Sequence, residues 1–313
     1  MPHDIIPDYL IQIDPGRLSR TLFHLAKDPL PYRKLNHTHP GQSRNTLYEA
    51  DDYLQERLET WGYAVSKEGV QVQAFRCDAS RPKAQQYSPP MPEDPWYTAY
   101  NLYVKKQGTV CPEETVLLLA HKDSQSWVDS PGAYDNGAGT VALLEIARVL
   151  KDYEPRRSLW FLFCNEEHRP WTSVAAAQNA KARGEDLTAI FNLDSMCGKS
   201  QQDIDAGRKT SVAIYTAPEG ERLADLILEA NETYRIGLAQ RKAQRARPGD
   251  DDGSFVNAGY PAAVAIFGSF PYADPAYHTE DDRPERVDIP NLAMAAQASL
   301  AAALRVDLER PST

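Results

Sequence analysis

Long apolar runs are absent from this 313-residue sequence. A membrane-spanning helix needs about 18 or more consecutive apolar residues, so the sequence predicts none. The N-terminal segment MPHDIIPDYLIQIDPGR also lacks the basic start and the continuous apolar stretch of a secretory signal. We therefore expect a cytoplasmic protein that does not contact membranes, or a secreted one if the sequence is a processed form.

Cysteine is scarce as well. The four cysteines are Cys77, Cys111, Cys164 and Cys197, and no two of them form a CxxC pair. Cys164 and Cys197 lie in apolar segments, where small buried thiols are expected, and such thiols suit a reducing compartment. A disulfide between Cys164 and Cys197 is the alternative if their segments are neighbours in the fold.

Basic residues are fewer than acidic residues. The chain carries 34 Lys and Arg against 44 Asp and Glu, which gives a net charge of -10. An acidic surface argues against nucleic-acid binding and against docking on anionic membranes. An excess of carboxylates is also what a site for divalent metal ions requires. The sequence does not indicate an oligomeric state.

Short apolar runs alternate with helical patterns along most of the chain. The clearest expected strands are 114–120 (ETVLLLA), 158–164 (SLWFLFC) and 189–194 (AIFNLD), and the clearest expected helices are 45–61, 139–150, 219–231 and 291–304. Nearly unbroken apolar strands between helices predict an α/β fold, with a mostly parallel twisted central sheet and helices on both faces. We expect one domain over residues 1–313, with a Pro-rich surface excursion at about 76–95.

Six polar residues follow the expected strands or the turns after them. They are His121, Asp135, Glu166, Glu167, Asp194 and His278. In a parallel α/β sheet, ligands bind at the carboxyl ends of the strands. These residue types at these positions therefore predict a site at one edge of the sheet.

Two of these residues have ordinary structural explanations when each is considered alone. His121 could be a core or surface histidine, but Asp123 lies two residues further on and could hold its imidazole in a metal-binding tautomer. Asp135, in PGAYDNGAGT, could be the N-cap of the helix that follows. The glycines around Asp135 would also let the backbone turn tightly enough to aim its carboxylate inward, where it could bridge two cations.

The other four residues differ in how readily they can be explained without a site. Glu166 and Glu167 could form a solvated turn, and both can serve one site only where the strand gives way to a loop. His278 could be an exposed loop residue. Asp194 ends an apolar run, where an unpaired carboxylate is costly unless it meets a cation.

Taken together, the set predicts a two-zinc hydrolase site. One metal would be bound by His121, Asp135 and Asp194, and the other by Glu167, His278 and the shared Asp135. Glu166 is left outside both ligand sets, as a general base must be. A metal-activated water would then have a pKa near 7, and Glu166 would transfer its proton to the leaving amine.

Five segments of the chain resemble the signature segments of the co-catalytic zinc aminopeptidases, a family that includes the bacterial leucyl aminopeptidases and aminopeptidase Y. The segments are AHKDS, PGAYDNGAGTVALLEIAR, FLFCNEE, NLDSM and YHTEDD. The resemblance extends from about Leu18 to the last helix and includes the order and approximate spacing of the segments. Asp252, in DDGSFVNAGYPAAV, matches more loosely a Ser-Asp-His-like segment of the family.

The resemblance implies a zinc exopeptidase-like fold, two Zn²⁺ per chain and peptide substrates with a free N-terminus. It implies that His121, Asp135, Glu167, Asp194 and His278 bind the zinc ions. It also implies that Glu166 is the base, that Asp123 orients His121, and that the Asp135–Asn136 peptide bond is cis. The first side chain of the substrate would enter a pocket that Met196, Phe255, Phe267 or Tyr277 could line.

The chain departs from the family where HRPWTS follows Glu166-Glu167 in place of a Gly-containing loop ending in Gly-Ser. That loop borders the substrate cleft, so the specificity and the end of the substrate that is bound stay open. Three alternatives to an aminopeptidase also stay open. A glutaminyl-peptide cyclotransferase has a similar fold but uses one zinc. A carboxypeptidase could use Arg169 to bind a terminal carboxylate. A receptor-like domain could keep the fold without catalysis, although here no ligand or base is missing.

Overall fold

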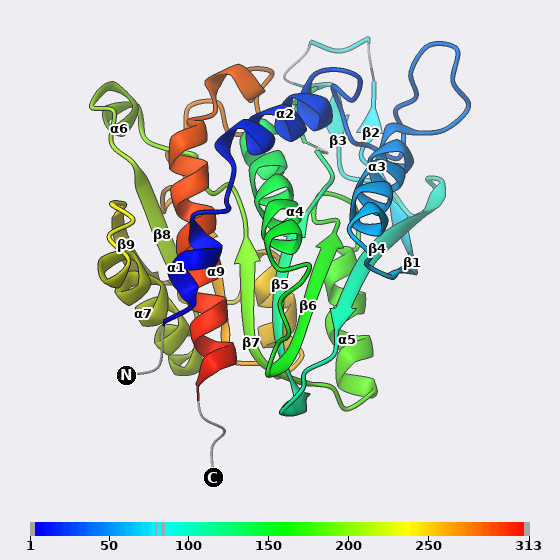
Figure 1. The fold of residues 1–313 in the computed structure, drawn as a ribbon. Helices are drawn as coiled ribbons and strands as arrows, with labels where there is room; N and C mark the ends of the chain where they lie inside the picture. The colour runs from blue at the N-terminus through cyan, green and yellow to red at the C-terminus, as the bar shows by residue number, and fades with distance from the viewer. Residues whose placement is uncertain (1–3, 79, 83–84, 125, 310–313) are drawn as a thin grey trace.

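The computed structural model describes residues 4–78, 80–82, 85–124 and 126–309. Its centre is an eight-stranded sheet in the order β1-β4-β6-β5-β7-β10-β8-β9. The strands are β1 (Val65–Gln73), β4 (Trp96–Lys106), β5 (Cys111–His121), β6 (Arg157–Cys164), β7 (Asp186–Leu193), β8 (Thr210–Tyr215), β9 (Ala239–Gln244) and β10 (Ala263–Phe267). The middle of this sheet is visible in Figure 1.

The sheet is parallel at its centre and mixed towards its edges. Strands β6, β5, β7 and β10 run parallel to their neighbours within this group. The pairs β1–β4, β4–β6 and β10–β8 are antiparallel, whereas β8–β9 is parallel. The predicted α/β class with a largely parallel central sheet is confirmed. The antiparallel pairings were not predicted, because an apolar run does not reveal the direction of its partner.

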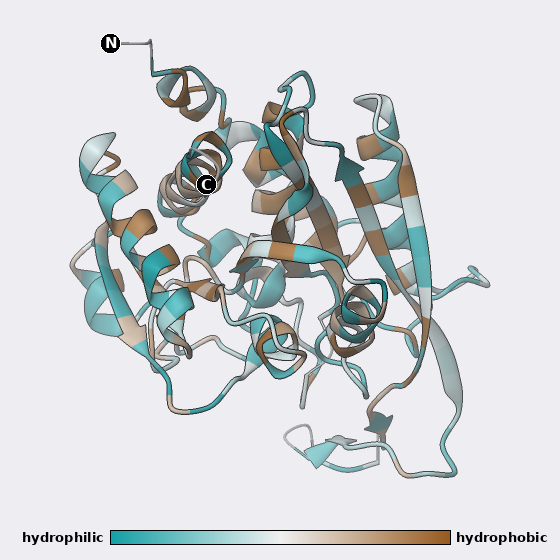
Figure 2. Cartoon of the chain, turned by 90° about the horizontal axis from the view of Figure 1, so that it is seen from below, coloured by the Kyte–Doolittle hydropathy of each residue, from teal (hydrophilic) through white to brown (hydrophobic). Residues whose placement is uncertain are grey.

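Helices lie on both sides of the sheet. They are α1 (Ile6–Leu10), α2 (Pro15–Ala26), α3 (Thr46–Thr60), α4 (Gly139–Val149), α5 (Thr172–Ala182), α6 (Gln201–Asp205), α7 (Pro218–Thr233), α8 (Asp250–Asn257) and α9 (Ile289–Leu308), with short turns η2 (Ala133–Ala138) and η3 (Pro284–Arg286). Side chains of α2, α4, α7 and α9 belong to the largest hydrophobic cluster, and those of α5 and α8 to a second one. Figure 2 shows hydrophobic residues on the central strands and the neighbouring helices.

Strand β5 shows why the apolar run at 114–120 is nearly unbroken. Val116, Leu118 and Ala120 belong to the larger hydrophobic cluster, whereas Leu117 and Leu119 belong to the second. Successive side chains of a strand point to opposite faces, so a strand covered on both faces must be apolar at every position. Every residue of β6 is buried for the same reason.

Local signals set the ends of the clearest helix. The side chain of Asn45 accepts a hydrogen bond from the Tyr48 N–H and caps the start of α3. Trp61 follows the last helical residue, and Gly62 then adopts a positive φ of 87°. A positive φ just past a helix strongly favours glycine, so the predicted helix at 45–61 with Gly62 as its cap is confirmed.

The Pro-rich excursion contains a small hairpin that the sequence did not reveal. Strand β2 (Arg76–Cys77) pairs antiparallel with β3 (Tyr87–Ser88). The Tyr87 hydroxyl lies 2.5 Å from an Asp129 carboxylate oxygen and 3.1 Å from Lys34 Nζ. The hairpin is therefore tied to two other segments of the chain.

All four cysteines are free thiols, and Cys164 and Cys197 are buried, as predicted. The alternative disulfide between them is not formed. Among the described residues, no helix is both long enough and apolar enough to cross a membrane.

Candidate metal centre

Three parallel strands bring distant polar residues to the same edge of the sheet. His121 is the last residue of β5 and is paired in register with Cys164, the last residue of β6. Glu166 and Glu167 follow β6 after one residue, and Asp194 follows β7 directly. The strand is no longer regular at the two glutamates, so both can approach the same site.

Asp135 lies in the tight turn η2 between β5 and α4. The Asp135–Asn136 peptide bond is cis, as the family resemblance implies. The Asn136 side chain donates to the Leu193 carbonyl at 2.8 Å and accepts from the Gly139 N–H at 2.8 Å. A Cβ atom at Gly139 would lie 2.0 Å from the Leu193 carbonyl oxygen, so only glycine fits there. The turn is thereby fixed against the end of β7.

A buried carboxylate holds the same turn from the other side. Asp282 accepts hydrogen bonds from the Tyr134 N–H at 2.6 Å and from the Asp135 N–H at 3.2 Å. Asp135 does not act as the N-cap of α4, because Ala138 occupies that position. Its carboxylate is free to point toward the imidazoles.

The Asp135 carboxylate lies between two histidines. Its Oδ1 is 3.1 Å from His121 Nε2, and its Oδ2 is 2.8 Å from His278 Nε2. Asp194 Oδ1 lies 3.6 Å from His121 Nε2, and Glu167 Oε1 lies 3.4 Å from His278 Nε2. In each of the two groups, His121–Asp135–Asp194 and Asp135–Glu167–His278, the potential ligand atoms lie within 4.8 Å of one another.

The donor set fits divalent metal ions. Three of its atoms are buried and make no hydrogen bond to another described residue, namely His121 Nε2, His278 Nε2 and Asp194 Oδ1. Buried polar atoms are normally hydrogen-bonded, so a cluster of exceptions needs an explanation. Imidazole nitrogen and carboxylate oxygen are both ligands that zinc accepts, and a bound cation would satisfy these atoms together.

Glu166 stands beside the two groups in a strongly acidic environment. Burial, Asp251, Asp250 and Asp194 raise its pKa well above the ordinary value, and His121 acts in the opposite direction. Asp250 belongs with Glu166 and Asp194 in a third group of closely spaced carboxylates. Sequence analysis singled out Asp252 in this segment; Asp252 and Asp250 are both ion-paired with Arg245, but only Asp250 belongs to this group. The only feature of the sequence that could have pointed to Asp250 is its place in a run of three consecutive aspartates.

Asp123 is fully buried and accepts hydrogen bonds at both carboxylate oxygens. His121 Nδ1 lies 3.2 Å from Oδ1, and the Glu166 N–H donates to the same oxygen at 3.1 Å. The Glu167 N–H donates to Oδ2 at 3.0 Å, and His168 Nδ1 lies 2.6 Å from that oxygen. Burial acts to raise the pKa of Asp123, but the two histidines outweigh it and lower that pKa well below its ordinary value.

His168 is a site residue that sequence analysis did not identify. Its Nε2 accepts a hydrogen bond from the Leu35 N–H at 3.4 Å, so its proton is on Nδ1, which donates to Asp123. It is fully buried. The departure HRPWTS marked this position, but only the fold brings the imidazole against Asp123.

The aromatic and methionine side chains predicted for a substrate pocket divide into two kinds. Met196, Phe255 and Phe267 are almost fully buried and belong to hydrophobic clusters, so in this structure they are core side chains. Tyr277 is half-buried and stacks on His278, with ring centroids 4.0 Å apart. Tyr277 therefore contacts a residue of the candidate centre.

Comparison with known proteins gives a family and a fold. The model of peptidase family M28 matches residues 101–303, which is more than half of the chain. The chain is 32% identical over 203 residues to Leucine aminopeptidase 1 of Phaeosphaeria nodorum, and the match covers 61% of this chain and 51% of that protein. The chain thus matches about half the length of this curated relative.

Two solved structures have similar folds. An aminopeptidase from Aneurinibacillus sp. strain AM-1 has a TM-score of 0.72 at 14% identity, with 96% of each chain covered. A glutaminyl cyclase from Bacteroides thetaiotaomicron, bound to N-acetylhistamine, has a TM-score of 0.71 at 16% identity, with 96% of this chain and 99% of that chain covered. At such identities the likeness concerns the fold alone.

Substitutions of His168 test whether it acts through Asp123. His168→Asn keeps an N–H near the Nδ1 position, whereas His168→Gln moves the polar group to the Nε2 position and His168→Phe removes both. We expect zinc affinity, measured by competition with a chelator, to stay near that of the wild type in the Asn variant. It should fall about 10- to 100-fold in the Phe and Gln variants, the usual cost of losing a partner of a metal ligand. The reverse order for Asn and Gln would mean that the Leu35 contact is what matters.

Proposed function

The chain belongs to peptidase family M28, and from this premise we propose that it is a zinc-dependent aminopeptidase that hydrolyses the first peptide bond of peptides with a free N-terminus. The observation that carries the proposal is the position of the Asp135 carboxylate, 3.1 Å from one imidazole and 2.8 Å from the other. A carboxylate with one histidine at each oxygen is suited to bridge two cations.

In this proposal two zinc ions are bound per chain. One would be held by His121, Asp135 and Asp194, and the other by Asp135, Glu167 and His278. Three carboxylates offset three of the four positive charges of two Zn²⁺, so the cluster needs only one further negative charge. When bound, the metal ions would supply Lewis acidity for the attacking water and for the oxygen of the scissile carbonyl.

The chain's own residues would divide the remaining work. Glu166, outside both ligand sets, would accept a proton from the attacking water and deliver it to the leaving amine. Asp123 would fix both the His121 ring and the backbone of Glu166 and Glu167, through the hydrogen bonds described above. The carboxylates of Glu166 and Asp250, which lie outside both ligand sets, would favour the positively charged N-terminus of a substrate.

A glutaminyl-peptide cyclotransferase is the alternative that the fold alone does not separate from an aminopeptidase, since both kinds of enzyme have similar folds. The presence of two ligand groups that share Asp135 favours the peptidase. We also propose that residues 1–313 form one domain, since strands from residue 65 to residue 267 join a single large sheet.

The proposal is tested with matched substrates and a metal count. Purified protein should contain about two zinc ions per chain and should cleave aminoacyl anilides that carry a free amine. N-acetylated versions of the same anilides should remain uncleaved. One zinc per chain with cyclisation of N-terminal glutamine would indicate the cyclotransferase. Cleavage of only the N-blocked substrates would refute the aminopeptidase.

Separate substitutions of the adjacent glutamates should have different effects. Glu166→Gln keeps the shape of the side chain but removes the base, so we expect turnover to fall by about 10²–10⁴ or more while both metal ions remain bound. Glu167→Gln should lower metal occupancy instead. Metal content and kcat measured on the same preparations distinguish the two effects. Retained activity in the Glu166 variant would exclude this residue as the base.

Zinc binding to metal-free protein should release protons. Burial acts to lower the pKa of His278, but the adjacent carboxylates of Asp135 and Glu167 outweigh it and raise the pKa to about 10. The pKa of His121 is also raised, since the adjacent carboxylates of Asp123, Asp135 and Asp194 outweigh burial. Both rings must lose a proton from Nε2 to bind metal, so affinity should increase with pH from 6 towards 9.

Isothermal titration calorimetry at pH 7 in buffers of different ionisation enthalpy measures the number of protons released. His278→Gln serves as the matched variant, because it removes one of the two protonated rings and should reduce the release by about one proton. Zinc binding without proton release would contradict the ligand assignment of both histidines.

A further inference from the structure

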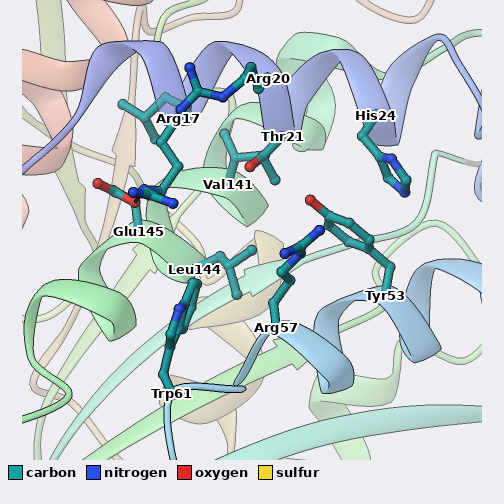
Figure 3. A pocket seen from close by; sticks show the side chains of 11 residues that line it. Arg17, Arg20, Thr21, His24, Tyr53, Arg57, Trp61, Val141, Leu144 and Glu145 are labelled. Atoms are coloured by element: carbon teal, nitrogen blue, oxygen red, sulfur yellow. Dashed lines mark ion pairs between the residues drawn. The ribbon is translucent and has the colours of Figure 1, made fainter. Parts of the chain in front are cut away.

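A second polar hollow lies apart from the candidate metal centre. It has a volume of about 300 Å³ and is formed by α2, α3 and α4. Figure 3 shows its side chains, which include Arg17, Arg20, Thr21, Tyr53, Arg57 and Glu145. None of its lining residues belongs to the groups that could bind zinc.

Two hydroxyl groups line this hollow without a protein partner. Thr21 comes from α2 and Tyr53 from α3, and their hydroxyls point toward the same space in Figure 3. Neither hydroxyl makes a hydrogen bond to another described residue. Both are therefore available to donate to a bound acceptor.

The arginines around the hollow are poorly neutralised. Arg57 lies with its guanidinium carbon 5.1 Å from the centre of the Tyr53 ring, and no carboxylate of the described chain pairs with it. Arg20 has only a distant partner, an Asp14 oxygen 3.9 Å away. Arg17 Nε is buried without a hydrogen bond and lies 3.5 Å from Glu145.

The Glu145 carboxylate, which lines the hollow, already accepts hydrogen bonds from other groups of the protein. Glu145 Oε1 accepts hydrogen bonds from the Asp14 N–H at 2.9 Å and from Arg148 Nη2 at 2.8 Å. Glu145 Oε2 accepts from Arg148 Nε at 3.0 Å. The hollow therefore presents several donors and three guanidinium groups, but little acceptor capacity to match them.

The charge around this hollow is opposite to that of the whole protein. Among the residues that line the hollow, three arginines face one glutamate, and Asp14 lies just outside it near Arg20, in a chain whose net charge is -10. His24, which also lines the hollow, has its pKa lowered by burial and by Arg57, whereas Asp28 acts in the opposite direction. A site of this kind attracts anions and repels cations.

From these donors and charges we propose that the hollow binds a phosphate-type oxyanion, either free or as the phosphoryl group of a small molecule. Guanidinium groups match the geometry of phosphate oxygens, and the Thr21 and Tyr53 hydroxyls add donors. Val141, Leu144 and Trp61 supply an apolar side of the hollow, against which a small organic group could pack. The proposal does not depend on the peptidase function.

Calorimetric titration with inorganic phosphate and with phenylphosphonate tests the site in zinc-loaded protein. We expect saturable binding that Arg57→Gln weakens tenfold or more and that Thr21→Val weakens about three- to tenfold. Thr21→Val leaves the net charge unchanged, so its effect separates a shaped site from general attraction to positive charge. An anion bound at the metal centre would not respond to Thr21→Val.

Arg222→Gln is the matched control, because Arg222 is exposed, pairs with Glu309 and lies outside the hollow. It should leave binding unchanged, and thermal unfolding should confirm that every variant is folded. Tighter binding of phenylphosphonate than of phosphate supports a phosphorylated small molecule as ligand, and equal binding supports the free ion. The proposal is overturned if the wild type and both hollow variants bind phosphate with equal affinity. It is also overturned if the Arg222→Gln variant binds phosphate as weakly as the Arg57→Gln variant.

Discussion

The centre of this protein depends on one buried carboxylate that faces two imidazoles. Asp135 is 7% exposed, and a carboxylate so enclosed must be met by positive charge or by hydrogen-bond donors. The structure places it there through a turn that is pinned from two directions. Asn136 and the close approach at Gly139 hold the turn to the end of β7, and Asp282 holds the preceding backbone.

Buried cations support the loops around this carboxylate. Arg33 is fully buried and donates to the carbonyls of Lys122, Pro131 and Gly132. It thus ties the segment after β5 to the start of the turn, and its charge offsets those of Asp282, Asp123 and Asp135. Lys122 is also fully buried and lies 3.0 Å from Asp51 of α3. Two buried cations, Arg33 and Lys122, thus help to hold the loops that carry the acidic side chains.

Much of this arrangement could be predicted from the sequence, and the exceptions have a common physical cause. The apolar runs that became β5, β6 and β7 were recognisable because burial on both faces leaves no polar position. The six polar residues were recognisable because they follow such runs, and the fold brings them together. Their roles as ligands and base stay predictions. The hairpin of β2 and β3, the antiparallel pairs and the roles of His168 and Asp250 depend on contacts between distant segments, which residue spacing does not encode.

The hydrogen bonds at Asp123 limit how this corner of the protein can change. Two backbone N–H groups and two imidazoles converge on one side chain with two oxygens. A neutral amide of the same shape would turn an NH₂ group toward donors, and a shorter or longer acid would leave some of them unmatched. The identity of residue 123 is thus set by four neighbours at once. Any change at residue 123 would therefore deprive two imidazoles and two backbone amides of their common acceptor in a single step, whereas a change at His168 affects one donor only.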